Sequence, residues 1–152
     1  METFSRGTDS TTLDPWYVTG FVEGEGSFTY SRNGRQLALY FGIKLTEADE
    51  PILEAIRDFF GGIGSIYYVQ PRAGAGGKGA GAAYYRVCRR EQLPVVVEHF
   101  DTYPLRGGKL ASYRIWREMV LLKQQFRQPD RDELQELAHQ LSATQVRSRS
   151  SH

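Results

Sequence analysis

The chain has 152 residues, of which 40% are hydrophobic and 24% charged, and its net charge is +1 at pH 7. These values are typical of one globular domain and exclude a collagen-like chain. No run approaches the ~20 apolar residues of a membrane span, and residues 1–15 lack the apolar core of a signal peptide. We therefore expect a soluble, intracellular protein without a membrane partner, in an organelle or a prokaryotic cytoplasm. The single Cys88 excludes an intramolecular disulfide.

The near-zero net charge hides a separation of charge along the chain. Residues 27–45 carry three basic and no acidic side chains, and residues 63–90 carry five basic and no acidic ones. Acidic side chains collect instead at 47–58 and 130–136. This separation predicts a surface that faces a polyanion. The alternative, basic side chains that only protect the edges of solvated strands, stays open.

The first predicted helix begins after a polar segment, residues 1–14, which we expect to be flexible. Asp14 and Pro15 are the residue types preferred at a helix N-cap and at the first helical position. The helix then covers 16–25, and glycine at position 26 follows its end.

Two β-hairpins are predicted, each after a helix. The first has strands over 27–31 and 37–45 around the dipeptide Asn33-Gly34, a strong hairpin signal. Its second strand alternates apolar and polar residues, which indicates one buried and one solvated face. The second hairpin has strands over 63–70 and 82–89 around a glycine-rich tip. The run 66–69 does not alternate, so its faces stay unassigned.

The remaining apolar periodicity predicts helices over 50–60, 91–100, 107–126 and 130–141. The order helix, hairpin, helix, hairpin, helices predicts an α+β fold in which an antiparallel sheet packs on helices and keeps one face open. We expect a single domain over residues 15–142 and a disordered tail over 143–152.

Two carboxylates, Glu23 and Glu25, fall in the last turn of the first predicted helix. The negative end of the helix dipole disfavours acids there, and a bound cation would compensate for them. A solvated acidic helix end is the alternative. Gly20 and Gly24 lie one turn apart on one helix face, where another helix backbone could approach closely.

The segment 18–28, VTGFVEGEGSF, resembles the motif of the LAGLIDADG homing endonuclease family. Later segments resemble the family in the same order, namely FGIKL at 41–45, FFGGIG at 59–64 and HFDTYPL at 99–105, ahead of Lys109. The resemblance covers about residues 16–119. It implies an αββαββα LAGLIDADG-type core, extended here by C-terminal helices, whose two β-hairpins form a saddle in the DNA major groove.

By position in the motif, Glu25 matches the metal-binding acid of the family, with the Gly24 carbonyl beside it and Mg²⁺ or Mn²⁺ as the ion. Glu23 then has a structural role. Lys109 matches the basic residue near the active site. Gly42 stands where relatives often carry a polar side chain, and we expect Lys44, on the same strand face, to replace that group in catalysis. The implied reaction is site-specific, metal-dependent hydrolysis of both strands of a long DNA duplex.

The chain has a single copy of the motif, which in this family implies a homodimer and a near-palindromic DNA target. We expect Gly20 and Gly24 at the dimer interface. Two other functions stay open, an RNA-binding intron-splicing maturase and a non-catalytic DNA-binding regulator. The candidates for DNA contact lie on the solvated strand faces and hairpin tips: Thr29, Arg32, Arg35, Tyr40, Lys44, Tyr67, Arg72, Lys78, Tyr84 and Arg86.

Overall fold

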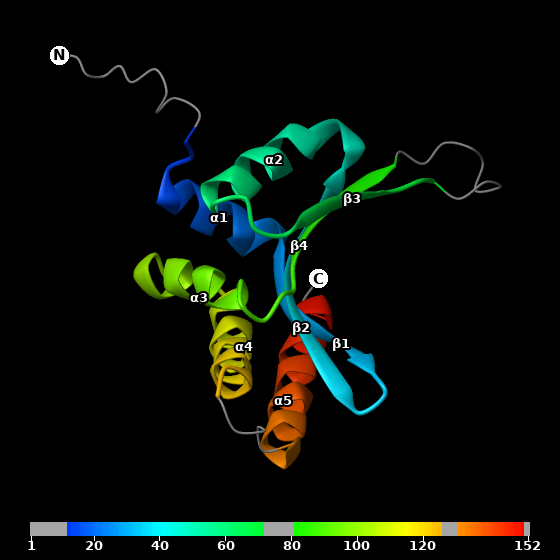
Figure 1. The fold of residues 1–152 in the computed structure, drawn as a ribbon, viewed down its shortest axis with the longest axis vertical. Helices are drawn as coiled ribbons and strands as arrows, with labels where there is room; N and C mark the ends of the chain where they lie inside the picture. Colours follow the sequence, from blue (N-terminus) through cyan, green and yellow to red (C-terminus); the bar gives the residue numbers. More distant parts are fainter. Residues whose placement is uncertain (1–11, 72–80, 126–130, 151–152) are drawn as a thin grey trace.

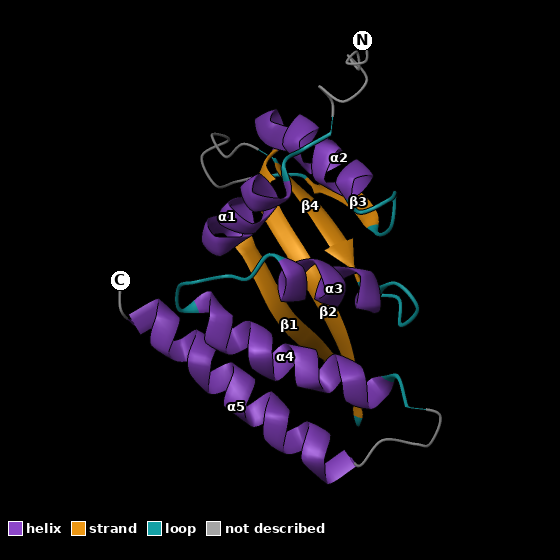
Figure 2. Ribbon diagram, turned by 90° about the vertical axis from the view of Figure 1, so that its left-hand side faces the viewer, coloured by secondary structure: helices purple, strands orange, loops and turns teal. Residues whose placement is uncertain are grey.

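A computed structural model describes residues 12–71, 81–125 and 131–150 of the chain. The helices pack against one face of a single β-sheet (Figure 1), and a view turned by 90° shows them in front of it (Figure 2). The element order confirms the predicted α+β fold, two αββ units followed by helices. In these ranges, no helix combines the length and the apolar character needed to cross a membrane.

The helices and strands form two repeated units and a helical end. The first unit contains α1 (Pro15–Glu25), β1 (Gly26–Asn33) and β2 (Gln36–Thr46). The second contains a short 3-10 helix, η2 (Glu47–Asp49), then α2 (Glu50–Phe59), β3 (Ser65–Val69) and β4 (Ala82–Val87). The helical end consists of α3 (Leu93–Thr102), α4 (Lys109–Lys123) and α5 (Arg131–Ser150).

Helix α1 begins as its sequence predicts. The side chain of Asp14 accepts a hydrogen bond from the backbone N–H of Trp16 at 2.7 Å, and Pro15 is the first helical residue. This contact satisfies one of the N–H groups that a helix leaves unpaired at its start. The orientation of α1 matters because the helix runs directly into β1 at its carboxyl end.

The four strands form one antiparallel sheet in the order β1-β2-β4-β3. The predicted turn after Asn33 is present, and Gly34 adopts a φ of +67°, in the left-handed region that glycine tolerates best. β2 pairs with β4, so Phe41 lies opposite Val87 and the two hairpins are joined at the centre of the sheet.

The helices cover the apolar face of the sheet. In β2, alternate side chains from Leu37 to Ile43 are buried, whereas Ala38 and Lys44 on the other face are exposed. Phe28 of β1 is only 1% exposed and lies at the centre of an aromatic cluster. Its ring centroid is 5.1 to 5.3 Å from those of Phe41, Phe100, Tyr113 and Trp116. Each such pair adds about 0.5–1.5 kcal/mol to the stabilisation from burial.

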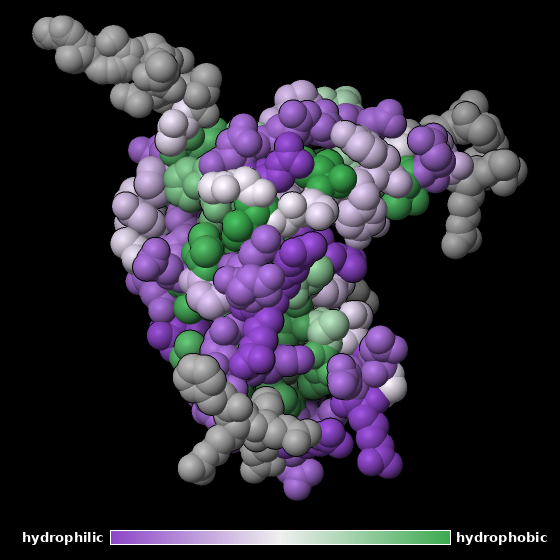
Figure 3. Space-filling view, in the orientation of Figure 1, coloured by the Kyte–Doolittle hydropathy of each residue, from purple (hydrophilic) through white to green (hydrophobic). Residues whose placement is uncertain are grey.

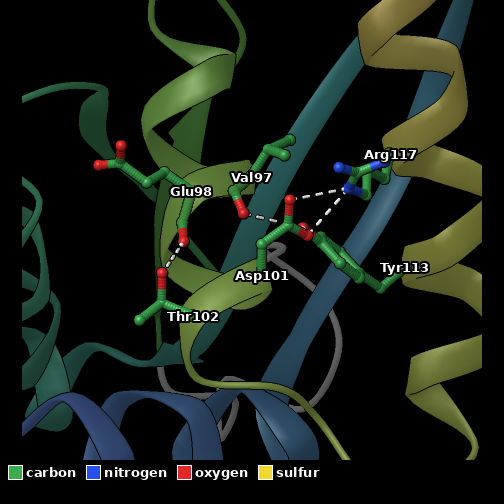
Figure 4. A network of polar contacts seen from close by, with 6 residues as sticks. All are labelled: Val97, Glu98, Asp101, Thr102, Tyr113 and Arg117. Carbon is green, nitrogen blue, oxygen red and sulfur yellow. Dashed lines mark hydrogen bonds and ion pairs between the residues drawn. The ribbon is translucent and has the colours of Figure 1, made fainter.

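A polar network joins α3 to α4 (Figure 4). Arg117 Nε donates to both carboxylate oxygens of Asp101 at 2.9 Å, and the Tyr113 hydroxyl donates to the same carboxylate at 2.8 Å. Asp101 belongs to α3, and the other two residues belong to α4. The network therefore holds α4, and with it Lys109 at the start of this helix, against the rest of the core.

Helix α5 continues to Ser150, so the prediction of a disordered segment over 143–152 is wrong for the residues that this helix includes. Polar contacts hold the first of the added residues. Thr144 Oγ1 lies 2.8 Å from Ser112 Oγ of α4, and Gln145 Nε2 donates to the Phe28 carbonyl of β1 at 3.0 Å. These contacts join segments distant in the sequence, so no local pattern announces them. Residues 1–11 lie outside the described part of the chain.

Candidate active site

Glu23 is bonded to the loop that precedes α4. Its carboxylate accepts the backbone N–H groups of Arg106 at 2.8 Å and Gly107 at 3.1 Å. A Cβ at position 107 would lie only 2.8 Å from Glu23 Oε2, so glycine permits this close approach. These contacts agree with the structural role predicted for Glu23, because its oxygens are occupied by the protein itself.

Glu25, by contrast, is exposed at the last position of α1. Within the described ranges, neither a hydrogen bond nor an ion pair holds its carboxylate. The preceding Gly24 is also exposed, with no atom within 4 Å of an added Cβ. A free carboxylate next to accessible backbone, at the negative end of a helix dipole, attracts a cation from outside the protomer.

Lys109 supplies one positive charge to this helix end. Its Nζ donates to the carbonyls of Val22 at 3.2 Å and Gly26 at 2.5 Å, and the Val22 carbonyl also accepts the backbone N–H of Gly26. Burial lowers the pKa of Lys109, and the negative charges of Glu23 and Glu25 oppose that shift. The structure thus places Lys109 at the acidic motif rather than in solvent.

Lys44 lies on the open face of the sheet, as predicted, but its described contact is not with the acidic motif. Its Nζ is 5.6 Å from the ring centroid of Tyr84, a distance suited to a cation–π interaction. No hydrogen bond or ion pair joins it to Glu25 in the described ranges. The structure therefore supports a surface position for Lys44 more directly than a catalytic one.

The open face of the sheet, opposite the helices, carries aromatic and basic side chains that contact one another. The Tyr67 and Tyr84 rings stack with centroids 5.1 Å apart and 4° between their planes. The Arg86 guanidinium carbon lies 3.9 Å from the Tyr40 centroid and 5.6 Å from the Tyr67 centroid. Together with Lys44, these residues form a preorganised cationic surface on rigid strands.

The structure separates the other predicted DNA contacts. Thr29 is opposite Tyr40 in the ladder and so shares the open face, and Arg35 is exposed in the turn of the first hairpin. Arg32 was predicted on the solvated face, and this placement is wrong. It shares the face of Phe28, and its Nη1 donates to Gln135 of α5 at 3.0 Å. The two remaining candidates, Arg72 and Lys78, lie outside the described residues.

No described residue of the chain covers the outer face of α1 at Gly20 and Gly24. Gly20, like Gly24, has no atom within 4 Å of an added Cβ. Trp16 and Tyr17 are 52% and 48% exposed, and Tyr17 stacks on Phe21 with centroids 6.0 Å apart. Figure 3 shows hydrophobic residues at the surface where α1, α2 and α3 come together. The aromatic pair was not predicted at an interface, although its spacing of four residues places it on one helix face.

The carboxyl end of α1 offers part of a binding site for a divalent cation. In the part of the chain that the structure describes, no three His, Cys, Asp or Glu side chains converge as a complete metal site. Mg²⁺ keeps several waters and takes one or two carboxylates, together with phosphate oxygens where a substrate supplies them. The free Glu25 carboxylate and the Gly24 carbonyl fit such an ion if a second carboxylate comes from outside the protomer.

The sequence profile described as LAGLIDADG endonuclease matches residues 18–120. Among curated proteins, the chain is 36% identical over 120 residues to the "Uncharacterized 50.9 kDa protein in ND4 intron 1" of Podospora anserina. It is 29% identical over 126 residues to the "Probable intron-encoded endonuclease 3" of Neurospora crassa. These matches cover 73% and 78% of this chain, but only 24% and 22% of the relatives.

Solved structures agree with the sequence match. The LAGLIDADG homing endonuclease I-SmaMI, in a crystal structure with cleaved DNA, has a TM-score of 0.63 and 30% identity. The meganuclease I-AabMI, bound to uncleaved DNA, has a TM-score of 0.62 and 29% identity. The matches cover 74% and 73% of this chain and 37% of each neighbour's chain. On the match over 18–120 and the shared architecture, this chain belongs to the LAGLIDADG endonuclease family.

Proposed function

We propose that this chain is one half of a divalent-metal-dependent DNA endonuclease that hydrolyses both strands of a long, near-palindromic duplex. The observation that carries the proposal is the contrast between the two acids of the motif. Glu23 is bonded to backbone N–H groups, whereas Glu25 is exposed and unpaired next to Lys109. The negative end of the helix dipole disfavours a carboxylate, and Glu25 makes no bond within the described residues that would offset this cost. It is therefore available to bind a cation.

Glu25 and the Gly24 carbonyl are the groups of this chain that would hold Mg²⁺ or Mn²⁺. A bound ion lowers the pKa of a coordinated water and stabilises charge on the leaving oxygen. Lys109 is held at the same helix end by two backbone carbonyls, where its ammonium stabilises negative charge that develops on the phosphate. Its position depends on the bond network that fixes α4.

Two copies of α1 are needed to complete the site. The exposed glycines of α1 leave room for a second helix, and a partner's motif brings a second carboxylate to the axis. The neighbours' chains, of which this chain covers 37%, have length for a second unit of similar size. We propose that a second copy of this chain takes that place, which makes the DNA target symmetric. Sedimentation as a monomer at micromolar concentration, with DNA present, would exclude this assembly.

The open face of the sheet supplies the DNA surface of the proposed enzyme. Lys44 and Arg86 lie on its strands, and Arg35 lies in a hairpin turn. Each copy of the chain would therefore contribute basic side chains to the saddle that faces the DNA groove. Because phosphate contacts release counterions, affinity for duplex DNA is expected to fall steeply with salt despite the net charge of +1. Binding that ignores salt would exclude this face as the DNA surface.

The decisive experiment selects targets from a randomised duplex library and then measures cleavage of a selected target with Mg²⁺, Mn²⁺, Ca²⁺ or a chelator. Wild type should cut only with Mg²⁺ or Mn²⁺. Glu25→Gln should lose cleavage and keep its affinity, because an amide cannot replace the anionic ligand. Glu118→Gln, an exposed acid of α4, is the matched control and should cut normally.

The other outcomes identify the competing functions. Tight binding of a selected duplex with no cleavage in either metal would establish the regulator. A preference for structured intron RNA over every duplex would establish the maturase. Loss of cleavage in Glu25→Gln together with loss of DNA binding would remove the assigned role of this carboxylate.

A further inference from the structure

Two aromatic rings restrict the position of the Arg86 side chain on the open face. Its guanidinium lies between two rings, 3.9 Å from the Tyr40 centroid and 5.6 Å from the Tyr67 centroid. Tyr40, Arg86 and Tyr67 come from three different strands, β2, β4 and β3. We call these three residues the arginine clamp. Contacts with rings on both neighbouring strands reduce the rotamer freedom that a free arginine would lose on binding.

The arginine clamp lies next to Gly42 on the open face. Gly42 lies opposite Arg86 in the ladder, and a Cβ at position 42 would lie 3.5 Å from two atoms of the Tyr40 ring. Arg86 therefore stands beside the position where this family often carries a polar residue.

The guanidinium of Arg86 is not fully bonded by the protein. Its Nε is buried and has no hydrogen-bond partner within the described ranges. A buried donor without an acceptor is unfavourable, and the rings of the clamp offer only their faces. Because Nε is buried, the donors of Arg86 that can reach a ligand are the terminal Nη1 and Nη2 groups, which no described residue bonds.

The sheet register places the clamp close to the acidic motif. β1 begins directly after Glu25, and its second residue, Ser27, is opposite Gly42, which is opposite Arg86. The same row ends at Ser65 of β3. Neighbouring strands are about 4.8 Å apart, so the backbone of Arg86 lies two strand spacings from that of Ser27, the second residue after Glu25. We therefore expect Arg86 to face the part of a bound duplex nearest the acidic motif rather than the outer end of the target.

We propose that Arg86 is a specificity-determining residue that donates to O6 and N7 of one guanine in the inner part of each half-site. Tyr40 and Tyr67 act as positioning residues for it. A planar fork of donors matches the two acceptors of guanine in the major groove better than any other base edge. A phosphate contact is the competing role of an arginine on this face. The inference rests on the proposed function, because it requires the open face to bind duplex DNA.

The first test compares the targets selected by wild type and by Arg86→Ala. Wild type should prefer guanine about tenfold to a hundredfold at one inner position of each half-site, and the variant should lose this preference while the other positions keep theirs. Arg35→Ala, which changes an exposed arginine of the hairpin turn, is the matched control and should leave the inner guanine unchanged. Equal weakening for all four bases, with a shallower salt dependence, would overturn base readout in favour of a phosphate contact.

The second test changes an atom of the DNA and compares wild type with variants of the arginine clamp. Replacing the inner guanine by 7-deazaguanine removes the N7 acceptor, so wild-type affinity should fall about tenfold and that of Arg86→Ala should not change. Tyr40→Phe keeps the ring and should keep the guanine preference, whereas Tyr40→Leu should reduce it. A wild-type protein indifferent to 7-deazaguanine would overturn the proposal even if it binds and cuts DNA. A wild type that binds no duplex would overturn the proposed function itself, which is a different result.

Discussion

The carboxylate of Glu23 accepts the backbone N–H of Arg106 at 2.8 Å, across 83 positions of the sequence. Gly107 donates to the other oxygen of the same carboxylate. These two hydrogen bonds link the end of α1 to the loop that precedes α4, and so determine where Lys109 enters the site. The two acids of the motif thus differ in role. Glu23 bonds the backbone of the loop before α4, whereas the carboxylate of Glu25 is not bonded by any described residue.

Glu23→Gln should lower the free energy of unfolding by about 1–2 kcal/mol. The amide keeps only one acceptor oxygen, and its NH₂ group faces a backbone N–H that it cannot bond. Urea unfolding of the free protein measures the change. Glu25→Gln removes the same charge without losing a bond, and taking an acid from a helix end should leave stability equal or raise it by up to about 1 kcal/mol. Equal destabilisation of both variants would contradict the division of roles.

Lys109→Met should reduce the single-turnover cleavage rate by about a hundredfold or more, with DNA affinity within about threefold of wild type. The methionine fills the space of the lysine stem but supplies neither the charge nor the bonds to Val22 and Gly26. Lys123→Met is a matched control. Lys123, the last residue of α4, is also partly buried and also donates to a backbone carbonyl, that of Leu37 in β2. A similar loss of cleavage in both variants would point to a general loss of stability.

Gly20→Leu should abolish self-association and leave the protomer folded. An added Cβ at position 20 meets no atom within 4 Å, and leucine favours the helix more than glycine does by about 1 kcal/mol. Analytical ultracentrifugation checks the oligomeric state, and circular dichroism checks the fold. Ala111→Leu, on an exposed position of α4, should associate like wild type. A Gly20→Leu protein that still forms the wild-type assembly would show that α1 is not its interface.

His99 should make the protein less stable in acid. Burial lowers the pKa of His99 to about 4 from its ordinary value of 6.5. Between these values the unfolded chain binds a proton that the folded protein excludes, so stability rises from pH 4 to pH 6.5 and is lost as the pH falls again. The neutral ring is also bonded, since Nε2 lies 3.0 Å from Thr19 Oγ1, whose hydroxyl donates to the Tyr103 carbonyl at 2.8 Å.

The effect of His99 should amount to about 2 kcal/mol over this interval. Urea unfolding at pH 4.5 and pH 7 measures it, and His99→Gln, which keeps a donor toward Thr19, should narrow the difference between the two pH values. His139→Gln changes an exposed histidine and should leave the difference as in wild type. An unchanged pH dependence in His99→Gln would assign the acid sensitivity to other groups.

Local patterns were sufficient for the elements that position the motif. Asp14 with Pro15, the Asn33-Gly34 dipeptide and the alternation of β2 each involve a few neighbouring residues, and the structure contains the helix start, the hairpin and the buried face that they predict. The family motif located Glu25 in the same way, because a helix end with its acid and glycines is a short, contiguous signal.

The tertiary structure alone decided the remaining features, because they depend on which segments meet across the fold. Arg32 lies on the α5 side of β1, and Thr144 and Gln145, just beyond the predicted end of α5, bond to residues far away in the sequence. Likewise, no spacing in the sequence predicts that Tyr40, Arg86 and Tyr67 come together in the arginine clamp. Strands β2 and β3 bring their rings to Arg86 only because β4 lies between them, and pairing of strands across the fold is not encoded in any local run of residues.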